Sequence, residues 1–437
     1  MSSRKIDNLI LGGGITGLAV AARLSEILPK SSSVETLIVE KSPFTGGLCR
    51  SVAKDGFTYD YSGHLLHLRR PDIRKWVFNM LDGNLREVSR DARIYSEGRL
   101  TKYPYQMNLW GLSGSTVKEC LSGLIDAHIA ARAPKPSGSF LKWSLDIFGG
   151  GITKNFMKPY NEKLFRLSAG DFNAEWCGGF VPRPSLEDAL RGAFSDAHKA
   201  VGYNASFFYP RRGGIQSLVD ALEIRARRVC EIRAGVFAEK IYPDSKRAIL
   251  SDGSEIKYRH LVSTIPLKDF ARACGMKSPA DNLRAAPVVC FNLGVKGNAG
   301  HGVHWMYFPE KKFNFYRVGF YSNINPASAP AGHYSMYVEV SFPSGKRRDI
   351  ARALDGAVSG LIDAGLIGSP SKIVSLDIRP MPNAYVVYDF ARANTVEKIR
   401  KAVNGKNVYL AGRYGAWKYS YMEESLAEAR AIAEKFV

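Results

Sequence analysis

The chain has 437 residues, of which 45% are hydrophobic and 23% charged, proportions typical of a globular protein and too apolar for a disordered one. At roughly 150 residues per domain, this length predicts two or three domains. The net charge of +20 suggests an anionic partner, which could be nucleic acid, a membrane surface or a phosphorylated ligand; the alternative is simply a basic surface. No nucleic-acid motif occurs, so we expect no nucleic-acid partner. No apolar run of about 18 residues occurs, so no membrane span is expected.

The two ends of the chain predict one parallel sheet. Residues 6–11 form an apolar strand, 12–17 a glycine turn, 18–28 an amphipathic helix and 36–40 a second parallel strand. The first apolar run is too short for a signal peptide, so we expect the mature protein to start at this N-terminus. Residues 406–436 again predict strand, turn and helix, which could rejoin this sheet.

The middle of the chain changes character twice. Residues from about 110 to 200 carry helical apolar spacing with Gly and Pro as breaks, which predicts a mostly helical insert. Segments between about 285 and 380 are rich in Val, Tyr and Phe and favour an antiparallel sheet, with a helix over 351–367. The six cysteines lack C-x-x-C spacing, which indicates reduced thiols, a cytoplasmic location and no metal site.

The glycine turn carries the first chemical signal. Gly12, Gly14 and Gly17 follow a strand and open a helix, a context in which the backbone can approach a pyrophosphate. Glu40 ends the next strand, where a carboxylate can bind a ribose hydroxyl pair. The pattern therefore predicts dinucleotide binding; the alternative is an ordinary glycine turn.

A second glycine pair, Gly46 and Gly47, follows Glu40 by six residues. NAD domains do not need this pair, whereas flavoproteins of the amine-oxidase superfamily look like this, because FAD is long and needs a second stretch of backbone. Gly412 and Arg413 before the last helix fit the same superfamily; the alternative for the pair is a surface turn. We expect the FAD site to comprise Gly12, Gly14, Ile15, Thr16, Gly17, Glu40, Lys41, Gly46, Gly47, Leu48, Ser62, Gly63, His64, Ala238, Gly412, Arg413, Tyr421 and Met422.

Two aromatic segments could hold a nucleobase. YPYQMN at 103–108 and FMKPYN at 156–161 interleave rings with amides; rings stack on bases and amides read their edges, although an aromatic core with capping amides is an equal alternative. His64 could likewise be a satisfied core histidine.

Taken together, these motifs make the chain resemble UDP-galactopyranose mutase, in its eukaryotic form more than the typical bacterial one. The resemblance extends from the N-terminus to Tyr419. It rests on GGGITGL, EKSPFTGGL, YSGHLLH, YPYQMN, FMKPYNEKLF, NASFFYPRRGG, LVSTIPL, WMYFPEKKFNFYRVGFYSN and GRYGAWKY.

The resemblance implies an isomerase that needs reduced FAD, whose N5 displaces UDP from the sugar so that the ring can open and reclose without net redox change. NADPH, NADH or another reductant could supply the electrons. A UDP-sugar is the implied substrate, and cell-surface polysaccharide biosynthesis the implied context; a homo-oligomer is left open. The implied catalytic residues are His64 beside the flavin, Arg317 on the diphosphate, and Tyr307, Tyr385 and Tyr419 as hydroxyl donors. The implied substrate-binding residues are Tyr103, Gln106, Asn108, Phe156, Tyr160, Asn161, Arg183, Asn204 and Trp305.

Two departures from the family pattern keep alternatives open. Phe180 stands where the family has a second diphosphate arginine, with Arg183 three residues on, and residues 419–425 look like other flavoproteins of the superfamily. An FAD-dependent oxidase or desaturase is therefore the alternative to a mutase, and a non-catalytic flavoprotein or basic binding module is a third.

The expected fold is α/β, with a discontinuous Rossmann-like FAD domain, a helical insert and an antiparallel β-sheet substrate domain. The expected FAD domain comprises 1–90, 201–284 and 405–437, the helical insert 91–200 with substrate nucleotide-binding segments, and the substrate domain 285–404. Within the last, strand alternation places Arg317 on one face with Phe315 and Gly319. A salt bridge to a core carboxylate is the alternative role for Arg317.

Overall fold

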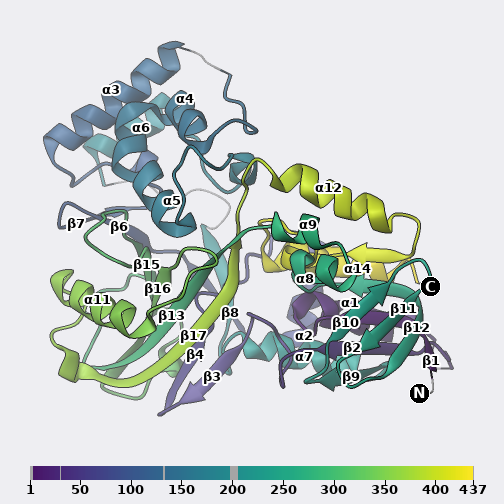
Figure 1. Cartoon of the computed structure of the whole chain (residues 1–437). Coiled ribbons are helices and arrows are strands. Elements are labelled where there is room, and N and C mark those ends of the chain that lie inside the picture. The colour runs from purple at the N-terminus through teal and green to yellow at the C-terminus, as the bar shows by residue number, and fades with distance from the viewer. Residues whose placement is uncertain (1–2, 30, 131–132, 197–204, 437) are drawn as a thin grey trace.

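The computed structural model describes residues 3–29, 31–130, 133–196 and 205–436. The N-terminal sheet has the strand order β10-β11-β12-β1-β2-β9, with β18 beside β12 (Figure 1). Its parallel members are β1 (Ser3–Leu11), β2 (Thr36–Glu40), β9 (Cys230–Ala234), β12 (Glu255–Ser263) and β18 (Val408–Leu410), and its antiparallel edge is β10 (Ala238–Tyr242) and β11 (Arg247–Leu250). The C-terminal strand β18 thus rejoins the first sheet, the arrangement that the sequence had left open.

Helices cover this sheet because its central strands are apolar on both faces. Helix α1 (Ile15–Ile27) contacts α7 (Gln216–Ala226) and α14 (Met422–Ala433). Ala19, Ala21 and Ala22 of α1 are fully buried, and their small side chains let the three helices lie close together. Also in this part of the molecule are α2 (Pro71–Leu81), α8 (Leu267–Ala273), α9 (Lys277–Asp281), α12 (Arg392–Val403) and α13 (Gly412–Gly415).

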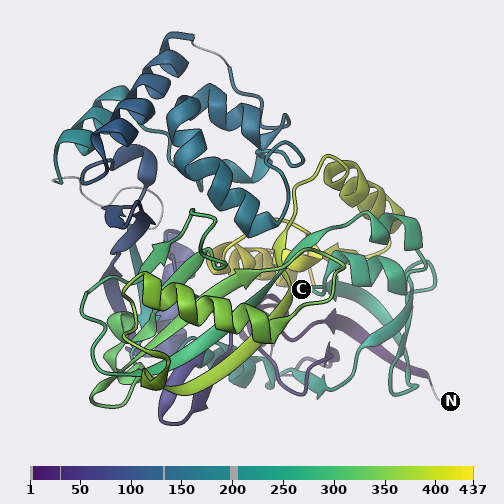
Figure 2. The same cartoon turned by 60° about the vertical axis from the view of Figure 1, so that its left-hand side comes forward.

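The second sheet has the order β17-β13-β16-β15-β14-β6-β7. Its strands are β17 (Ile373–Val386), β13 (Ala285–Lys296), β16 (His333–Ser341), β15 (Arg317–Phe320), β14 (Trp305–Tyr307), β6 (Ala92–Ser96) and β7 (Arg99–Lys102). All neighbours are antiparallel except β14 and β6. Helix α11 (Ile350–Asp363) covers the outer face, where its apolar residues join a separate core cluster (Figure 2).

Two details of this sheet differ from the sequence expectations. Strands β6 and β7 fall within 91–200, the range expected for the helical insert, yet they pair with the second sheet. Of the strand-like segment 313–322, only 317–320 is a strand, and α10 (Tyr321–Ile324) follows it. Phe315 therefore packs in the outer core cluster with Val318, so the expected shared face of Phe315 and Arg317 is wrong: alternation begins only at residue 317.

The helical insert lies at the top of Figure 1, and its helix α5 packs against β13 and β16 of the second sheet. It contains α3 (Gly114–Ala130), α4 (Phe140–Ile152), a π-helical turn (Thr153–Met157), α5 (Lys158–Phe165) and α6 (Leu186–Phe194). Helices α3 and α4 cross closely, and only a glycine fits at the crossing. A Cβ on Gly149 would lie 1.8 Å from the carbonyl oxygen of Gly123. None of the helices in the described ranges is long and apolar enough to cross a membrane.

Short elements complete the fold. The pair β3 (Ser51–Lys54) and β4 (Phe57–Asp60) and the pair β5 (Leu85–Ser89) and β8 (Ser206–Pro210) form two-stranded sheets. Single 3₁₀ turns occur at Tyr105–Met107, Glu175–Cys177, Pro326–Ser328 and Pro370–Lys372. Strand β4 leads directly into the loop that carries His64, between the two large sheets.

Candidate active site

One cavity of about 910 Å³ joins the N-terminal sheet, the second sheet and the helical insert. It begins at the glycine turn after β1 and extends to the aromatic residues of α5. Of the expected FAD residues, those that line it are Gly12, Gly14, Ile15, Thr16, Glu40, Lys41, Gly46, Gly47, Leu48, Ser62, Gly63, His64, Ala238, Arg413, Tyr421 and Met422. Of the expected catalytic and substrate residues, those that line it are Tyr103, Gln106, Phe156, Tyr160, Asn161, Trp305, Tyr307, Arg317, Tyr385 and Tyr419.

The two glycine turns form a single cradle at one end of the cavity. Gly14 and Gly46 form a parallel bridge, and the amide of Gly46 donates to the carbonyl of Gly13 at 2.7 Å. Gly12 and Gly46 have φ near +100°, a conformation that favours glycine. A Cβ on Gly14 would meet no protein atom within 4 Å, so its open side faces the cavity and leaves room for a pyrophosphate at the N-terminus of α1.

Gly17 and Gly412 support the cradle without lining the cavity. A Cβ on Gly17 would meet the carbonyl oxygen of Gly12 at 2.1 Å, and a Cβ on Gly412 would meet the hydroxyl of Thr16 at 2.5 Å. Gly17 therefore lets α1 pack directly on the backbone of the glycine turn, and Gly412 lets the C-terminal turn pack directly on Thr16 of α1.

Glu40 lies beside the same cradle. Its carboxylate accepts the amide of Gly13 at 2.8 Å and the amide of Ser42 at 2.7 Å. Each carboxylate oxygen has a second lone pair, so Glu40 can also accept ribose hydroxyls. The residues present thus fit the pyrophosphate and ribose of FAD.

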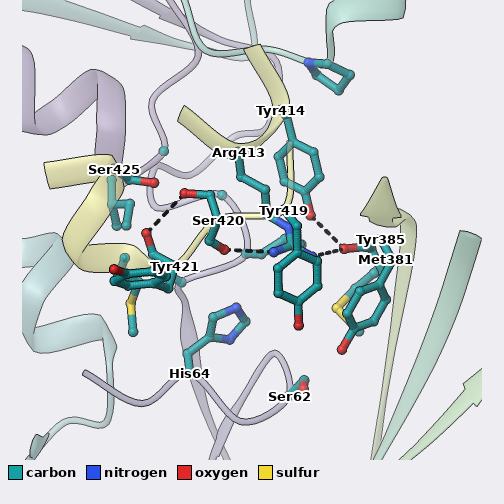
Figure 3. A pocket seen from close by; sticks show the side chains of 18 of the residues that line it. Ser62, His64, Met381, Tyr385, Arg413, Tyr414, Tyr419, Ser420, Tyr421 and Ser425 are labelled. Atoms are coloured by element: carbon teal, nitrogen blue, oxygen red, sulfur yellow. Dashed lines mark hydrogen bonds between the residues drawn. The ribbon is translucent and has the colours of Figure 1, made fainter. Parts of the chain in front are cut away.

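The middle of the cavity holds His64 and Arg413 (Figure 3). Burial, with the nearby guanidinium groups of Arg317 and Arg413, lowers the pKa of His64 to about 4. The imidazole is therefore neutral at neutral pH, and its Nδ1 is buried without a hydrogen-bond partner in the described chain. Arg413 donates to the carbonyls of Ser420 at 2.8 Å and Ala384 at 3.0 Å.

Arg317 lines the cavity but has a carboxylate partner. Its Nη2 donates to Glu339 at 2.8 Å and to the hydroxyl of Ser62 at 3.1 Å, and its Nε also donates to Glu339. The Glu339 side chain is only 2% exposed. The core salt bridge considered for Arg317 is therefore present. Because Nη1 has no hydrogen bond within the described residues, one edge of the guanidinium remains available to a ligand.

Sequence reasoning missed Glu339, although a signal existed. A single carboxylate stands in the apolar run YVEVSF, and every residue of β16 after His333 is buried. A buried charge needs a paired charge or a ligand, so this glutamate could have been singled out beside Arg317.

A tyrosine cluster surrounds the Arg317 end of the cavity. The rings of Tyr385 and Tyr419 stack at 6.2 Å, and Figure 3 shows their hydroxyls pointing to the side of His64 and Ser62. The ring centroid of Tyr307 lies 5.2 Å from that of Tyr103 and 5.4 Å from that of Tyr160. Burial raises the pKa of Tyr385 and Tyr419, so these phenols stay protonated and can donate hydrogen bonds.

The α5 end of the cavity is aromatic with two amides. The rings of Tyr105, Phe156 and Tyr160 form a stacked column with spacings of 5.2 and 5.4 Å. The Nε2 atom of Gln106 donates to the carbonyl of Pro182 at 2.6 Å. Its Oε1 atom is buried and has no partner in the described chain. The surface offers stacking and an acceptor to a flat ligand with an N–H group.

Two of the expected substrate residues, Asn108 and Arg183, do not line the cavity. Asn108 donates to the carbonyl of Pro104 at 2.9 Å and is buried in the turn. Arg183 is exposed, with its guanidinium over the ring of Trp143 at 5.8 Å. Asn204 lies outside the described residues. Phe180 instead lines the cavity, where its ring contacts Tyr419 at 4.7 Å.

A buried carboxylate fixes the start of the His64 loop. Asp60 accepts hydrogen bonds from Ser51 at 2.6 Å, from Tyr209 at 2.8 Å and from the amide of Ile215 at 3.3 Å. Burial outweighs these bonds and raises its pKa to about 7.

No group of three His, Cys, Asp or Glu suited to a metal occurs in the described part of the chain.

This pKa predicts a pH dependence of stability. Between about pH 4 and pH 7 the folded chain holds a proton on Asp60 that the unfolded chain has lost, so Asp60 makes the free energy of unfolding fall as pH rises through this window. We expect Asp60→Asn to weaken that fall, measured by urea unfolding of both proteins at several pH values. Identical slopes for the two proteins would contradict the assignment.

Comparison with known proteins supports a flavin site. The family model "flavin containing amine oxidoreductase" matches residues 15–435. A reduced UDP-galactopyranose mutase superposes with a TM-score of 0.90 and 27% identity, over 98% of this chain and 95% of that one. A putative protoporphyrinogen oxidase from Exiguobacterium sp. 255-15 superposes with a TM-score of 0.75 and 17% identity, over 100% and 99% of the two chains, and shares the fold alone.

The curated relatives point to a different chemistry. A 4,4'-diapophytoene desaturase of Staphylococcus aureus strain RF122 is 35% identical over 98 residues. The aligned region is 22% of this chain and 17% of the desaturase, so this chain spans about a sixth of the length of the curated relatives it matches.

Proposed function

Because the chain belongs to the flavin-containing amine oxidoreductase family, it is an FAD enzyme, and we propose that it interconverts the pyranose and furanose forms of a nucleotide sugar, with UDP-galactose as the reference substrate. The observation that carries the proposal is the match to the reduced mutase, which spans nearly the whole of both chains at a TM-score of 0.90. The resemblance in sequence motifs supports the same activity.

The cavity residues suit each part of such a substrate. The column of Phe156 and Tyr160, with Gln106 and Asn161 nearby, offers stacking and amide contacts to the base. The free edge of Arg317 and the phenols of Tyr385 and Tyr419 offer donors to the diphosphate. The sugar would then lie between this anchor and His64, with Trp305 on the wall of the cavity.

The chain's own residues would prepare the reaction rather than carry electrons. Reduced FAD, when bound, supplies a nucleophilic ring nitrogen for reversible displacement of UDP, with no net redox change. Donors around the diphosphate would hold UDP in place while it is detached, so that it can return to the same carbon. The neutral His64 adds no positive charge beside the reacting centre.

An FAD-dependent oxidase or desaturase is the second candidate. It is favoured by the desaturase relatives and by Glu339, which already neutralises Arg317. A desaturase would need no diphosphate anchor and would accept hydride on oxidised FAD.

The two candidates predict opposite redox requirements. We expect protein reduced with dithionite to convert UDP-galactofuranose into UDP-galactopyranose over many turnovers per equivalent of reductant, and oxidised protein to be inactive. Product separation and a peroxide assay measure this. Activity of the oxidised protein, with one peroxide or one reduced flavin per product, would overturn the mutase proposal and favour the second candidate.

A further inference from the structure

The second sheet presents two rows of cross-strand neighbours to the cavity. In the first row Tyr307 pairs with Arg317, which pairs with Glu339. In the second row, two residues further along each strand, Trp305 pairs with Gly319, which pairs with Tyr337. All of these residues except Gly319 line the cavity. Because side chains at i and i+2 share a face, Tyr337 belongs to the same surface as Arg317.

Two glycines make room for the ring of Tyr337. A Cβ on Gly319 would lie 2.1 Å from its Cζ atom, and a Cβ on Gly63 would lie 2.4 Å from its hydroxyl. The Tyr337 ring thus packs on the backbone of Gly319, and its hydroxyl lies against Gly63 in the loop that carries His64. The guanidinium of Arg317 lies 5.8 Å from the ring centroid.

The phenol of Tyr337 has no hydrogen bond with any residue that the structure describes, although the residue is only 1% exposed. By contrast, the buried Tyr321 donates to the carbonyl of Asp60 at 2.8 Å, and Tyr334 donates to the carbonyl of Leu366 at 2.8 Å. The hydroxyl oxygen of Tyr337 is not among the fully buried unpaired side-chain atoms of the described chain, so its small accessible surface lies in the cavity that the residue lines.

We propose that Tyr337 is a further substrate-binding residue whose hydroxyl donates to the diphosphate of the nucleotide sugar beside Arg317, an inference that rests on the proposed function. Glu339 neutralises much of the charge of Arg317, so an anion at this place needs additional neutral donors. Burial keeps the pKa of Tyr337 far above neutral, and the phenol therefore remains a donor. The close fit against Gly319 holds it in place without side-chain freedom to lose on binding.

The test is Tyr337→Phe in the FAD-loaded protein, with Tyr334→Phe as the matched control. The control removes the same atom from the same strand, but on the opposite face, in the outer core cluster. We expect Tyr337→Phe to weaken UDP binding about ten- to a hundredfold, and to leave uridine binding, FAD content and melting temperature unchanged. Tyr334→Phe should bind UDP as the wild type does.

A second variant tests the role of the glycine. Gly319→Ala places a Cβ against the Tyr337 ring, so we expect it to weaken UDP binding as Tyr337→Phe does. Equal UDP affinity in Tyr337→Phe and Tyr334→Phe, or an equal loss for uridine, would overturn the inference while an active wild type still supports the mutase. A wild-type protein that neither binds UDP nor interconverts the sugars would overturn both.

Discussion

Arg317→Ala is expected to weaken UDP binding by about 2–5 kcal/mol, the cost of losing a charge-assisted contact to phosphate. Arg317 lines the cavity together with Tyr307, Tyr385 and Tyr419, and its Nη1 atom has no partner within the described residues. Titration of FAD-loaded protein with UDP, followed by calorimetry, measures the loss. Unchanged UDP affinity in a folded variant would reject the role.

The ion pair with Glu339 complicates this variant and provides its control. Removing Arg317 leaves a carboxylate that is 2% exposed, and an uncompensated buried charge destabilises a fold by about 3–5 kcal/mol. We therefore expect Arg317→Ala to melt well below the wild type. The double variant Arg317→Met with Glu339→Gln should recover much of that stability, because both groups are neutral, but should not recover UDP binding.

These two readouts separate anchoring from folding. If the double variant regains both stability and UDP affinity, Arg317 serves the ion pair alone and the diphosphate is held elsewhere. If it regains stability without affinity, the guanidinium contacts the ligand. Urea unfolding and UDP titration on the same preparations distinguish these outcomes.

Gly14→Val is expected to give a folded but colourless protein, with FAD content at least about tenfold below wild type. Gly14 has φ −73° and ψ 178°, values that a β-branched residue adopts without strain. No protein atom lies within 4 Å of its ideal Cβ, so the new side chain would occupy the cavity and exclude the pyrophosphate. Absorbance of the purified protein and FAD release on denaturation measure the effect.

Gly302→Val is the matched control for bulk alone. Gly302 is exposed, lies outside the cavity, and its ideal Cβ also meets no atom within 4 Å. It should remain yellow with full FAD content. A yellow Gly14→Val protein would show that the cofactor does not approach the turn at this glycine, and release of NAD instead of FAD would contradict the cofactor assignment.

The sequence alone determined the local elements that hold the cofactor. Gly12, Gly14 and Gly17 between a strand and a helix require a tight turn with an open backbone, and this requirement is visible in residue type and spacing. Apolar periodicity likewise revealed the helical insert and the strands of the second sheet, since periods of 3.6 and 2 reflect which faces are buried. The strand, turn and helix at the end of the chain were predicted, whereas the pairing of residues 408–410 with the first sheet was only one possibility until the structure showed it.

The tertiary structure decided which side chains meet. Whether Arg317 faces a carboxylate depends on the register between β15 and β16, and whether Tyr337 reaches the cavity depends on the glycine opposite it. Such pairings join residues about twenty positions apart or more, and local periodicity does not encode them. The same reason explains why Arg183 is three residues from Phe180 in sequence yet lies outside the cavity, and why β6 and β7 join a sheet whose other strands come after residue 284.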